Sequence, residues 1–93
     1  MKMDIKYIEN FWEHLSDTVP TENMEYAIDE FDIDVEKVRN TNELSEEEAT
    51  TLMCNLVYMA VNGLFSGDFD VVYDILVDVC EMPEDLAEEL LDF

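Results

Sequence analysis

The sequence predicts an all-α protein, a compact single-domain bundle of five or six helices over residues 1–93. Apolar side chains recur every three or four residues along most of the chain, which is the spacing of a helix face buried in a core. Only two Gly and two Pro interrupt the chain, and 48% of its residues are apolar, which is enough for a core. A capping box at Ser45 marks one helix start independently of hydropathy.

The first part of the chain is predicted to form three helices. The first covers about 4–17, where apolar side chains keep helical spacing until Pro20 stops it. Thr21 has the hydroxyl of an N-cap and is expected to cap the second helix. The third helix is short and is expected to begin at Asp32 or Asp34, whose carboxylates suit the same role.

The capping box is the clearest helix start in the sequence. Ser45 and Glu48 have the spacing at which the hydroxyl accepts from the third amide of the helix and the carboxylate accepts from the cap amide. After a loop at 40–43, this helix is expected to cover 45–65 and to terminate at Gly67. Its middle is apolar nearly all round, which predicts a central buried helix or one shared with a partner chain.

Helix and strand compete in the next segment, from Asp68 or Asp70 to about Glu81. Its β-branched valines would suit a strand. Asp70, Asp74 and Asp78 recur every four residues, however, and that is a helical period. We therefore predict a helix capped by Asp68 or Asp70.

Segment 77–83 leads into the last predicted helix, in which Pro83 takes the first position and Leu86 and Leu90 face inward. This segment can be aligned with 28–34, because each joins two helices through a tight acidic corner. The matches are too few to establish a repeat.

The charge of the chain is extreme, since 25 Asp and Glu against four Lys and Arg give −21 at pH 7. All four cations lie in the first 39 residues, and residues 40–93 hold 14 carboxylates without a Lys or Arg. Two carboxylates about 6 Å apart repel by about 0.7 kcal/mol even in bulk water, so this crowding opposes folding. A net charge of about 2 to 8 suffices for solubility, and the excess calls for a functional explanation or an unusual environment.

The sequence also predicts the cellular compartment of the protein. The apolar runs are too short for a membrane-spanning helix, the first residues do not form a signal peptide, and anionic lipid would repel the chain. We therefore expect a cytoplasmic protein with no membrane partner. Cys54 and Cys80 are expected to be reduced core cysteines, with a single disulfide as the alternative.

Groups for catalysis or metal binding are scarce. His14 is the only histidine and is expected to be an ordinary surface residue. Lys37 replaces the glycine that a calcium-binding loop needs at its turn. The oxygen-bearing residues that otherwise match this loop are Asp32, Asp34, Glu36, Asn40 and Glu43. We expect neither an enzyme nor a bound metal or cofactor.

The carboxylates themselves form the remaining candidate site. Positions i and i+4 of a helix lie about 6 Å apart along its axis, so acids at this spacing form rows. Such rows are comparable with the phosphates of a nucleic-acid strand, and a groove lined with Lys and Arg would bind either. An ordinary solvated helix face would mix both signs of charge. The candidate partner-binding residues are Glu46, Glu47, Glu48, Asp68, Asp70, Asp74, Asp78, Glu81, Glu84, Asp85, Glu88, Glu89 and Asp92.

In physical type the chain resembles the DNA-mimic inhibitors of phages and mobile elements, small acidic helical proteins that block restriction enzymes, CRISPR effectors or other DNA-binding proteins. The resemblance rests on the row of Asp70, Asp74 and Asp78, the acidic face at 84–92, the cluster at 46–48 and the missing cations. It implies a non-enzymatic inhibitor that acts in the host cytoplasm. Members of this class do not share one fold, so the resemblance implies nothing about the fold.

Three functions therefore stand as expectations. The leading one is an inhibitor that occupies the nucleic-acid groove of a basic protein or nuclease complex, with Phe69 and Tyr73 adding apolar contact. Such a protein does not itself bind nucleic acid, and a homodimer is an alternative to a monomer. The alternatives are an immunity or antitoxin-type protein that caps a cationic toxin, and an acidic helical adaptor.

Overall fold

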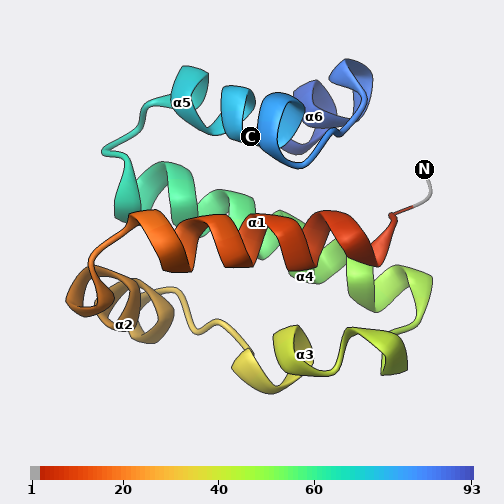
Figure 1. The fold of residues 1–93 in the computed structure, drawn as a ribbon, viewed down its shortest axis with the longest axis horizontal. Helices are drawn as coiled ribbons and strands as arrows, with labels where there is room; N and C mark the ends of the chain where they lie inside the picture. The colour runs from red at the N-terminus through yellow and green to blue at the C-terminus, as the bar shows by residue number, and fades with distance from the viewer. Residues whose placement is uncertain (1–2) are drawn as a thin grey trace.

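The structure is a computed structural model that describes residues 3–93, and these residues form an all-α, single-domain bundle (Figure 1). The predicted fold class is confirmed. The α-helices are α1 (Ile5–Thr18), α2 (Thr21–Glu30), α3 (Val35–Arg39), α4 (Glu46–Met59), α5 (Phe69–Asp74) and α6 (Glu84–Leu90). A 3-10 turn, η1 (Thr41–Glu43), and two π-helical turns, η2 (Ala60–Leu64) and η3 (Ile75–Val79), complete the described elements.

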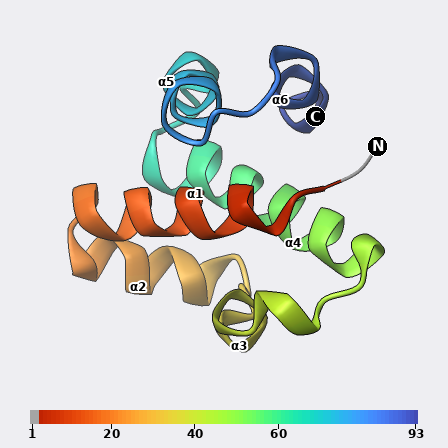
Figure 2. The same ribbon diagram turned by 45° about the vertical axis from the view of Figure 1, so that its right-hand side comes forward.

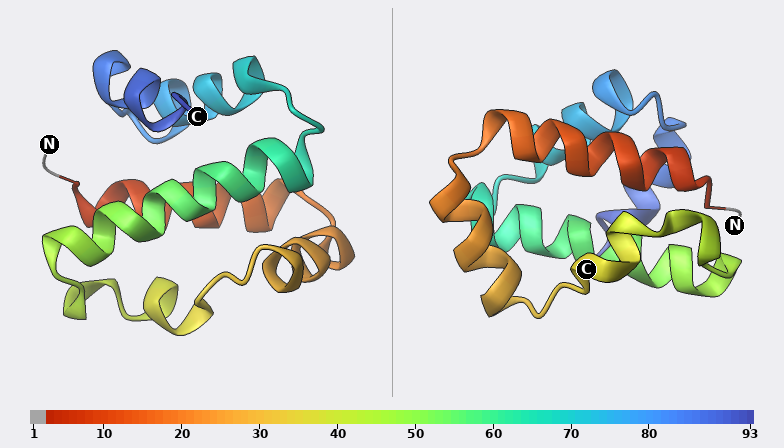
Figure 3. Two further views of the ribbon diagram at one scale, coloured as in Figure 1. Left: turned by 180° about the vertical axis from the view of Figure 1, so that it is seen from behind. Right: turned by 60° about the horizontal axis from the view of Figure 1, so that its bottom comes forward.

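The helices form three layers. α1 and α4 lie side by side in the middle layer and run in the same direction (Figures 1 and 3). α2 and α3 cover one side of this pair, and α5, η3 and α6 cover the other (Figures 1 and 2). The two outer layers therefore present separate surfaces to solvent.

The core fills the space between these layers. Phe11 of α1, Met53 and Leu56 of α4 and Leu76 of η3 are fully buried, so each layer adjoining α1 and α4 is held by apolar contact. The segment 40–43, predicted as a loop, contains η1 instead, which the Leu44 amide closes by donating to the Thr41 carbonyl at 3.1 Å. The buried Thr41 hydroxyl also donates a 2.6 Å hydrogen bond to Glu9 Oε2. Within residues 3–93, no helix is both long and apolar enough to cross a bilayer.

Helix starts follow the predicted caps with two corrections. Asp34, Ser45 and Asp68 cap α3, α4 and α5 through their side chains. Pro20 and Pro83 take the N-cap positions of α2 and α6, where extended backbone with φ of −55° and −58° suits proline. Thr21 is therefore the first residue of α2 and not its cap, and α6 begins one residue after the predicted position.

The predicted helices at 45–65 and 68–81 are confirmed as helices, but each ends in a π turn. The Phe65 amide donates to the Ala60 carbonyl at 2.9 Å, and the Cys80 amide donates to the Ile75 carbonyl at 3.1 Å. These are i to i−5 bonds, which define π-helical geometry. Gly67 follows the first π turn with φ of 85°, so its predicted role as a terminator is confirmed.

Three corners between helices share a left-handed residue at the same position. The backbone is left-handed at Asp32, Ser66 and Glu81, with φ of 55°, 53° and 56°. Two residues after each of them stands the N-cap of the next helix: Asp34, Asp68 or Pro83. The similarity of segments 28–34 and 77–83 therefore reflects a common turn between helices.

Replacing Glu81 by glycine is expected to stabilise the fold by about 1 kcal/mol, because a left-handed conformation is costly for a residue with a Cβ atom. The matched control is Glu88→Gly, which removes the same charge from the interior of α6 and is expected to cost about 1 kcal/mol. Urea denaturation measures both free energies of unfolding. Equal destabilisation by the two substitutions would contradict the left-handed conformation at Glu81.

Candidate functional site

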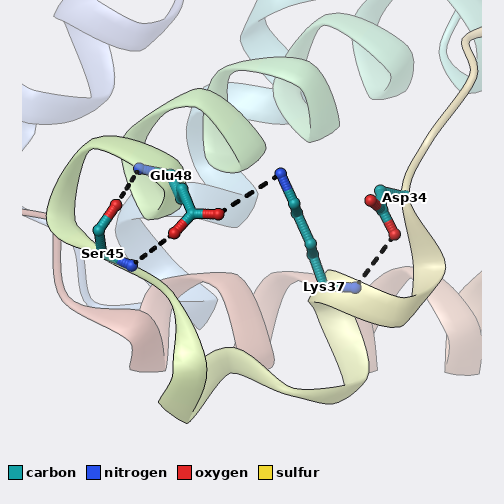
Figure 4. A network of polar contacts seen from close by, with 4 residues as sticks. All are labelled: Asp34, Lys37, Ser45 and Glu48. Carbon is teal, nitrogen blue, oxygen red and sulfur yellow. Dashed lines mark hydrogen bonds and ion pairs between the residues drawn. The ribbon is translucent and has the colours of Figure 1, made fainter.

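All thirteen candidate carboxylates are exposed, as their predicted role requires. The structure divides them into two separate groups. Ten of them belong to residues 68–93, which form the α5, η3 and α6 layer (Figure 2). The other three, at 46–48, lie at the start of α4 beside α3 (Figure 4).

The exposed face of residues 68–93, here called the α5–α6 surface, carries no compensating cation. Its ten carboxylates stand without a single Lys, Arg or His in the segment, which gives −10 at pH 7. The described ion pairs of residues 3–93 both involve α3, through Lys37 and Arg39, in the opposite outer layer. The charge of the α5–α6 surface is therefore left for solvent or a partner to neutralise.

Tyr73 of α5 lies within electrostatic reach of acids from both α5 and α6. Its side chain is half-buried, and desolvation raises the pKa of its phenol. The carboxylates of Glu84 and Glu88 on α6 raise the pKa further, followed by those of Asp74 and Asp78. Carboxylates of α6 and of the α5–η3 segment thus act on the same phenol, although they are far apart in the sequence.

The predicted row on α5 is only partly a regular helical row. Asp70 and Asp74 lie within α5, but Asp78 lies in η3. The i to i−5 hydrogen bonding of a π turn changes the angle between successive side chains, so α-helical spacing does not extend to Asp78. Asp68 also has a structural task, since its Oδ1 accepts a 3.2 Å hydrogen bond from the Val71 amide.

The cluster at 46–48 is separate from the α5–α6 surface and is partly neutralised (Figure 4). The Glu48 carboxylate accepts from the Ser45 amide at 3.1 Å and pairs with Lys37 Nζ at 3.7 Å. Hydrogen bonds from Ser45 lower the pKa of Glu48, and Lys37 lowers it further. Asp34 holds Lys37 in turn, because its Oδ1 caps the Lys37 amide at 3.2 Å (Figure 4). Capping and ion pairing therefore explain Glu48 without a partner.

A chain of aromatic rings borders the α5–α6 surface. Phe31 packs edge-on against Tyr58 at 5.8 Å between ring centroids, Tyr58 lies 5.1 Å from Phe93, and Phe93 lies 5.4 Å from Phe69. Tyr58, Phe69 and Phe93 are 48%, 40% and 52% exposed, so this is an accessible apolar strip next to many carboxylates. Sequence reasoning identified Phe69 as a contact residue but missed Tyr58 and Phe93.

The aromatic strip continues into a groove on the α5–α6 surface. The groove has a volume of about 350 Å³ and is lined by Phe69, Asp70, Tyr73, Glu88 and Leu91. Two aromatic rings and two carboxylates thus face one hollow. Such a combination can accept a group that is both cationic and flat.

The two cysteines differ in environment. Cys80 is buried, as predicted, and burial raises the pKa of its thiol to about 11. The prediction that Cys54 lies in the core is wrong, because Cys54 is exposed on the same stripe of α4 as Tyr58, four residues later. Both thiols are free, and α4 exposes Cys54 and Tyr58 and is therefore not buried all round.

Within residues 3–93, His14 and the calcium-loop residues are not gathered into a cluster that could hold a metal ion. His14 is half-buried in a shallow depression with Asn10, Glu13, Asp17 and Val79. The described residues contain no group of three or more His, Cys, Asp or Glu placed to hold a metal ion. In the calcium-loop segment, the carboxylate of Glu36 pairs with Arg39 at 3.7 Å.

The titration of Tyr73 tests the meeting of α5 and α6. Because its pKa is raised above the ordinary value of 10, Tyr73 stabilises the fold fully below pH 10, and this contribution is lost as pH rises through the raised folded value. We expect Glu84→Gln with Glu88→Gln to lower the Tyr73 pKa, read from phenolate absorbance with Tyr73→Phe as the assignment control. Glu22→Gln with Glu25→Gln on α2 removes the same charge and should leave this pKa unchanged. Equal pKa values in the two double variants would show that α6 does not face Tyr73.

Comparison of the chain with protein-family models, with curated proteins and with solved structures finds no match in any of the three.

Proposed function

We propose that this chain is a non-enzymatic inhibitor that mimics nucleic-acid charge and occupies the nucleic-acid groove of a basic protein in the cytoplasm. The observation that carries the proposal is the cation-free α5–α6 surface, with ten carboxylates in residues 68–93. A surface of this charge repels phosphate, so its partner is a protein rich in Lys and Arg and not a nucleic acid.

The density of charge supports a nucleic-acid groove as the target. α5 and the π turn η3 together cover residues 69–79 and extend at most about 15 Å, the length at the α-helical rise of about 1.5 Å per residue. Four carboxylates lie along this stretch and its cap: Asp68, Asp70, Asp74 and Asp78. One strand of DNA carries about four phosphates over the same length, at about 3.4 Å per phosphate. A groove built to neutralise that strand therefore meets a similar number of charges on this surface.

The aromatic strip supports a protein partner as well. Interfaces gain most of their affinity from a few buried anchors, and Tyr and other aromatic residues are enriched among them. Phe69 and Phe93 place exposed rings beside the carboxylates, so burial of apolar surface would add to the electrostatic attraction. Exposed rings beside carboxylates favour a protein groove as the binding partner of this surface over loosely held counterions.

A CRISPR effector or a restriction enzyme is the kind of host defence complex that we propose as the target. Such complexes have extended basic grooves for nucleic acid, and blocking the groove would stop them before any chemistry occurs.

Competition with nucleic acid tests the proposal. The full chain is immobilised, and proteins captured from a host lysate are eluted by a salt step and identified. The proposal predicts that the captured protein binds nucleic acid, that short DNA or RNA displaces it, and that binding weakens steeply with salt. Salt-insensitive capture, or nucleic acid that remains in its groove while the chain is bound, would contradict the proposal.

A further inference from the structure

The groove lined by Phe69, Asp70, Tyr73, Glu88 and Leu91 is the feature of the α5–α6 surface that is most specific in its chemistry. Its volume of about 350 Å³ lies at the lower end of the range for small-ligand pockets, about 300–1,000 Å³. A single side chain of a partner is thus a suitable occupant. Its lining combines the rings of Phe69 and Tyr73 with the carboxylates of Asp70 on α5 and Glu88 on α6.

The charge around the groove selects the occupant. The phenol of Tyr73 senses four carboxylates, from Glu84, Glu88, Asp74 and Asp78. A second copy of this chain would bring a surface of −10 against another of −10, so self-association through this groove is opposed by charge. A cationic side chain in the groove meets complementary charge from both helices, at Asp70 of α5 and Glu88 of α6.

The aromatic walls distinguish between cations. The guanidinium of arginine is planar, weakly hydrated and able to stack on an aromatic ring while it bonds to a carboxylate in bidentate fashion. The ammonium of lysine is compact and strongly hydrated, so it loses more on leaving water. Phe69 offers a ring 40% exposed at the groove, and Asp70 and Glu88 offer carboxylates.

We infer that this groove binds an arginine side chain of the partner, which stacks on Phe69 and Tyr73 and pairs with Asp70 or Glu88. The inference rests on the proposed function, since it names the anchor by which a basic partner is held. An arginine site in this groove would make the α5–α6 surface bind partners with arginine-lined grooves more tightly than partners with lysine-lined grooves.

Binding of an oligoarginine peptide and an oligolysine peptide of equal length to the full chain tests this inference. Titration calorimetry at one salt concentration is expected to show tighter binding of oligoarginine, by about 5- to 30-fold from the cation–π contribution. Phe69→Leu keeps an apolar side chain without a ring and should remove most of this preference. Tyr26→Leu is the matched control, because Tyr26 is 71% exposed on α2 in the other outer layer, and it should keep the preference.

A second pair of variants tests the carboxylates. Asp70→Asn with Glu88→Gln should weaken oligoarginine binding more than Glu22→Gln with Glu25→Gln, which removes the same charge from α2. Circular dichroism confirms that each variant is folded. Equal binding of the two peptides by the unaltered chain, or an arginine preference that survives Phe69→Leu, would overturn the inference.

The two proposals fail in different ways. If nucleic acid competes for the partner but the peptides bind equally, the groove is not an arginine site and the proposed function stands. If arginine is preferred but nucleic acid does not compete, the arginine site stands and the partner's nucleic-acid groove is not the target.

Discussion

Replacing Asp74 and Asp78 by lysine is expected to weaken binding to the proposed basic partner by on the order of 100-fold. The two substitutions change the charge of the α5–α6 surface from −10 to −6 and place cations against a cationic groove. Juxtaposed like charges cost several kcal/mol, and each 1.4 kcal/mol is a factor of ten in affinity. Both side chains are exposed and neither makes a hydrogen bond or ion pair within residues 3–93, so the fold should persist.

The matched control for this double variant is Glu22→Lys with Glu25→Lys on α2. It changes the net charge of the chain by the same amount in the opposite outer layer. Binding is measured by surface plasmon resonance at several salt concentrations, and most of the loss in the Asp74 and Asp78 variant is expected in the association rate. Equal losses in both variants would show that only the total charge matters, and would remove the α5–α6 surface as the binding site.

Replacing Gly63 by alanine is expected to destabilise the fold by about 1–3 kcal/mol, although alanine favours helix over glycine by about 1 kcal/mol. A Cβ atom on Gly63 would lie 2.6 Å from Cε2 of Phe31 and 3.2 Å from its Cδ2. The Phe31 ring is half-buried and packs against Tyr58 at 5.8 Å, so it cannot move without disturbing the aromatic strip. The loss from steric overlap therefore exceeds the gain in helix propensity.

A double-mutant cycle isolates this contact. In a Phe31→Ala background the obstructing ring is gone, and Gly63→Ala should then be neutral or stabilising. Free energies of unfolding from urea denaturation of the four proteins give the coupling between the two positions. The same cost of Gly63→Ala with and without the Phe31 ring would show that the two residues do not touch.

Helix starts were predictable because their chemistry is local. Ser45 and Glu48 form the capping box from four consecutive residues, and Asp34 and Asp68 each bond an amide three positions later. The π turns η2 and η3 were not predictable, since a change of hydrogen-bond register leaves no mark on composition or hydropathy. The N-cap of α2 was predicted one residue too late, at Thr21. Two neighbouring residues suit an N-cap there, because Thr21 has a hydroxyl and Pro20 has the extended backbone that the position needs.

The sequence was enough to predict which carboxylates are exposed, but not which of them lie close together in the fold. The exposure of the carboxylates follows from the cost of burying charge without a partner. Which acids meet depends on the layers, and these separate the cluster at 46–48 from residues 68–93. The aromatic strip joins residues far apart in the chain, and Tyr58 lies in an apolar run whose exposed stripe cannot be identified before the neighbouring helices are placed.

The most direct test of the proposed charge mimicry is displacement of labelled nucleic acid from the purified partner by the full chain, followed by fluorescence anisotropy. The account predicts complete, competitive displacement, with an inhibition constant that rises steeply with salt and is raised by on the order of 100-fold in the Asp74→Lys and Asp78→Lys variant. A ternary complex, in which the chain binds while the anisotropy of the nucleic acid stays high, would contradict it.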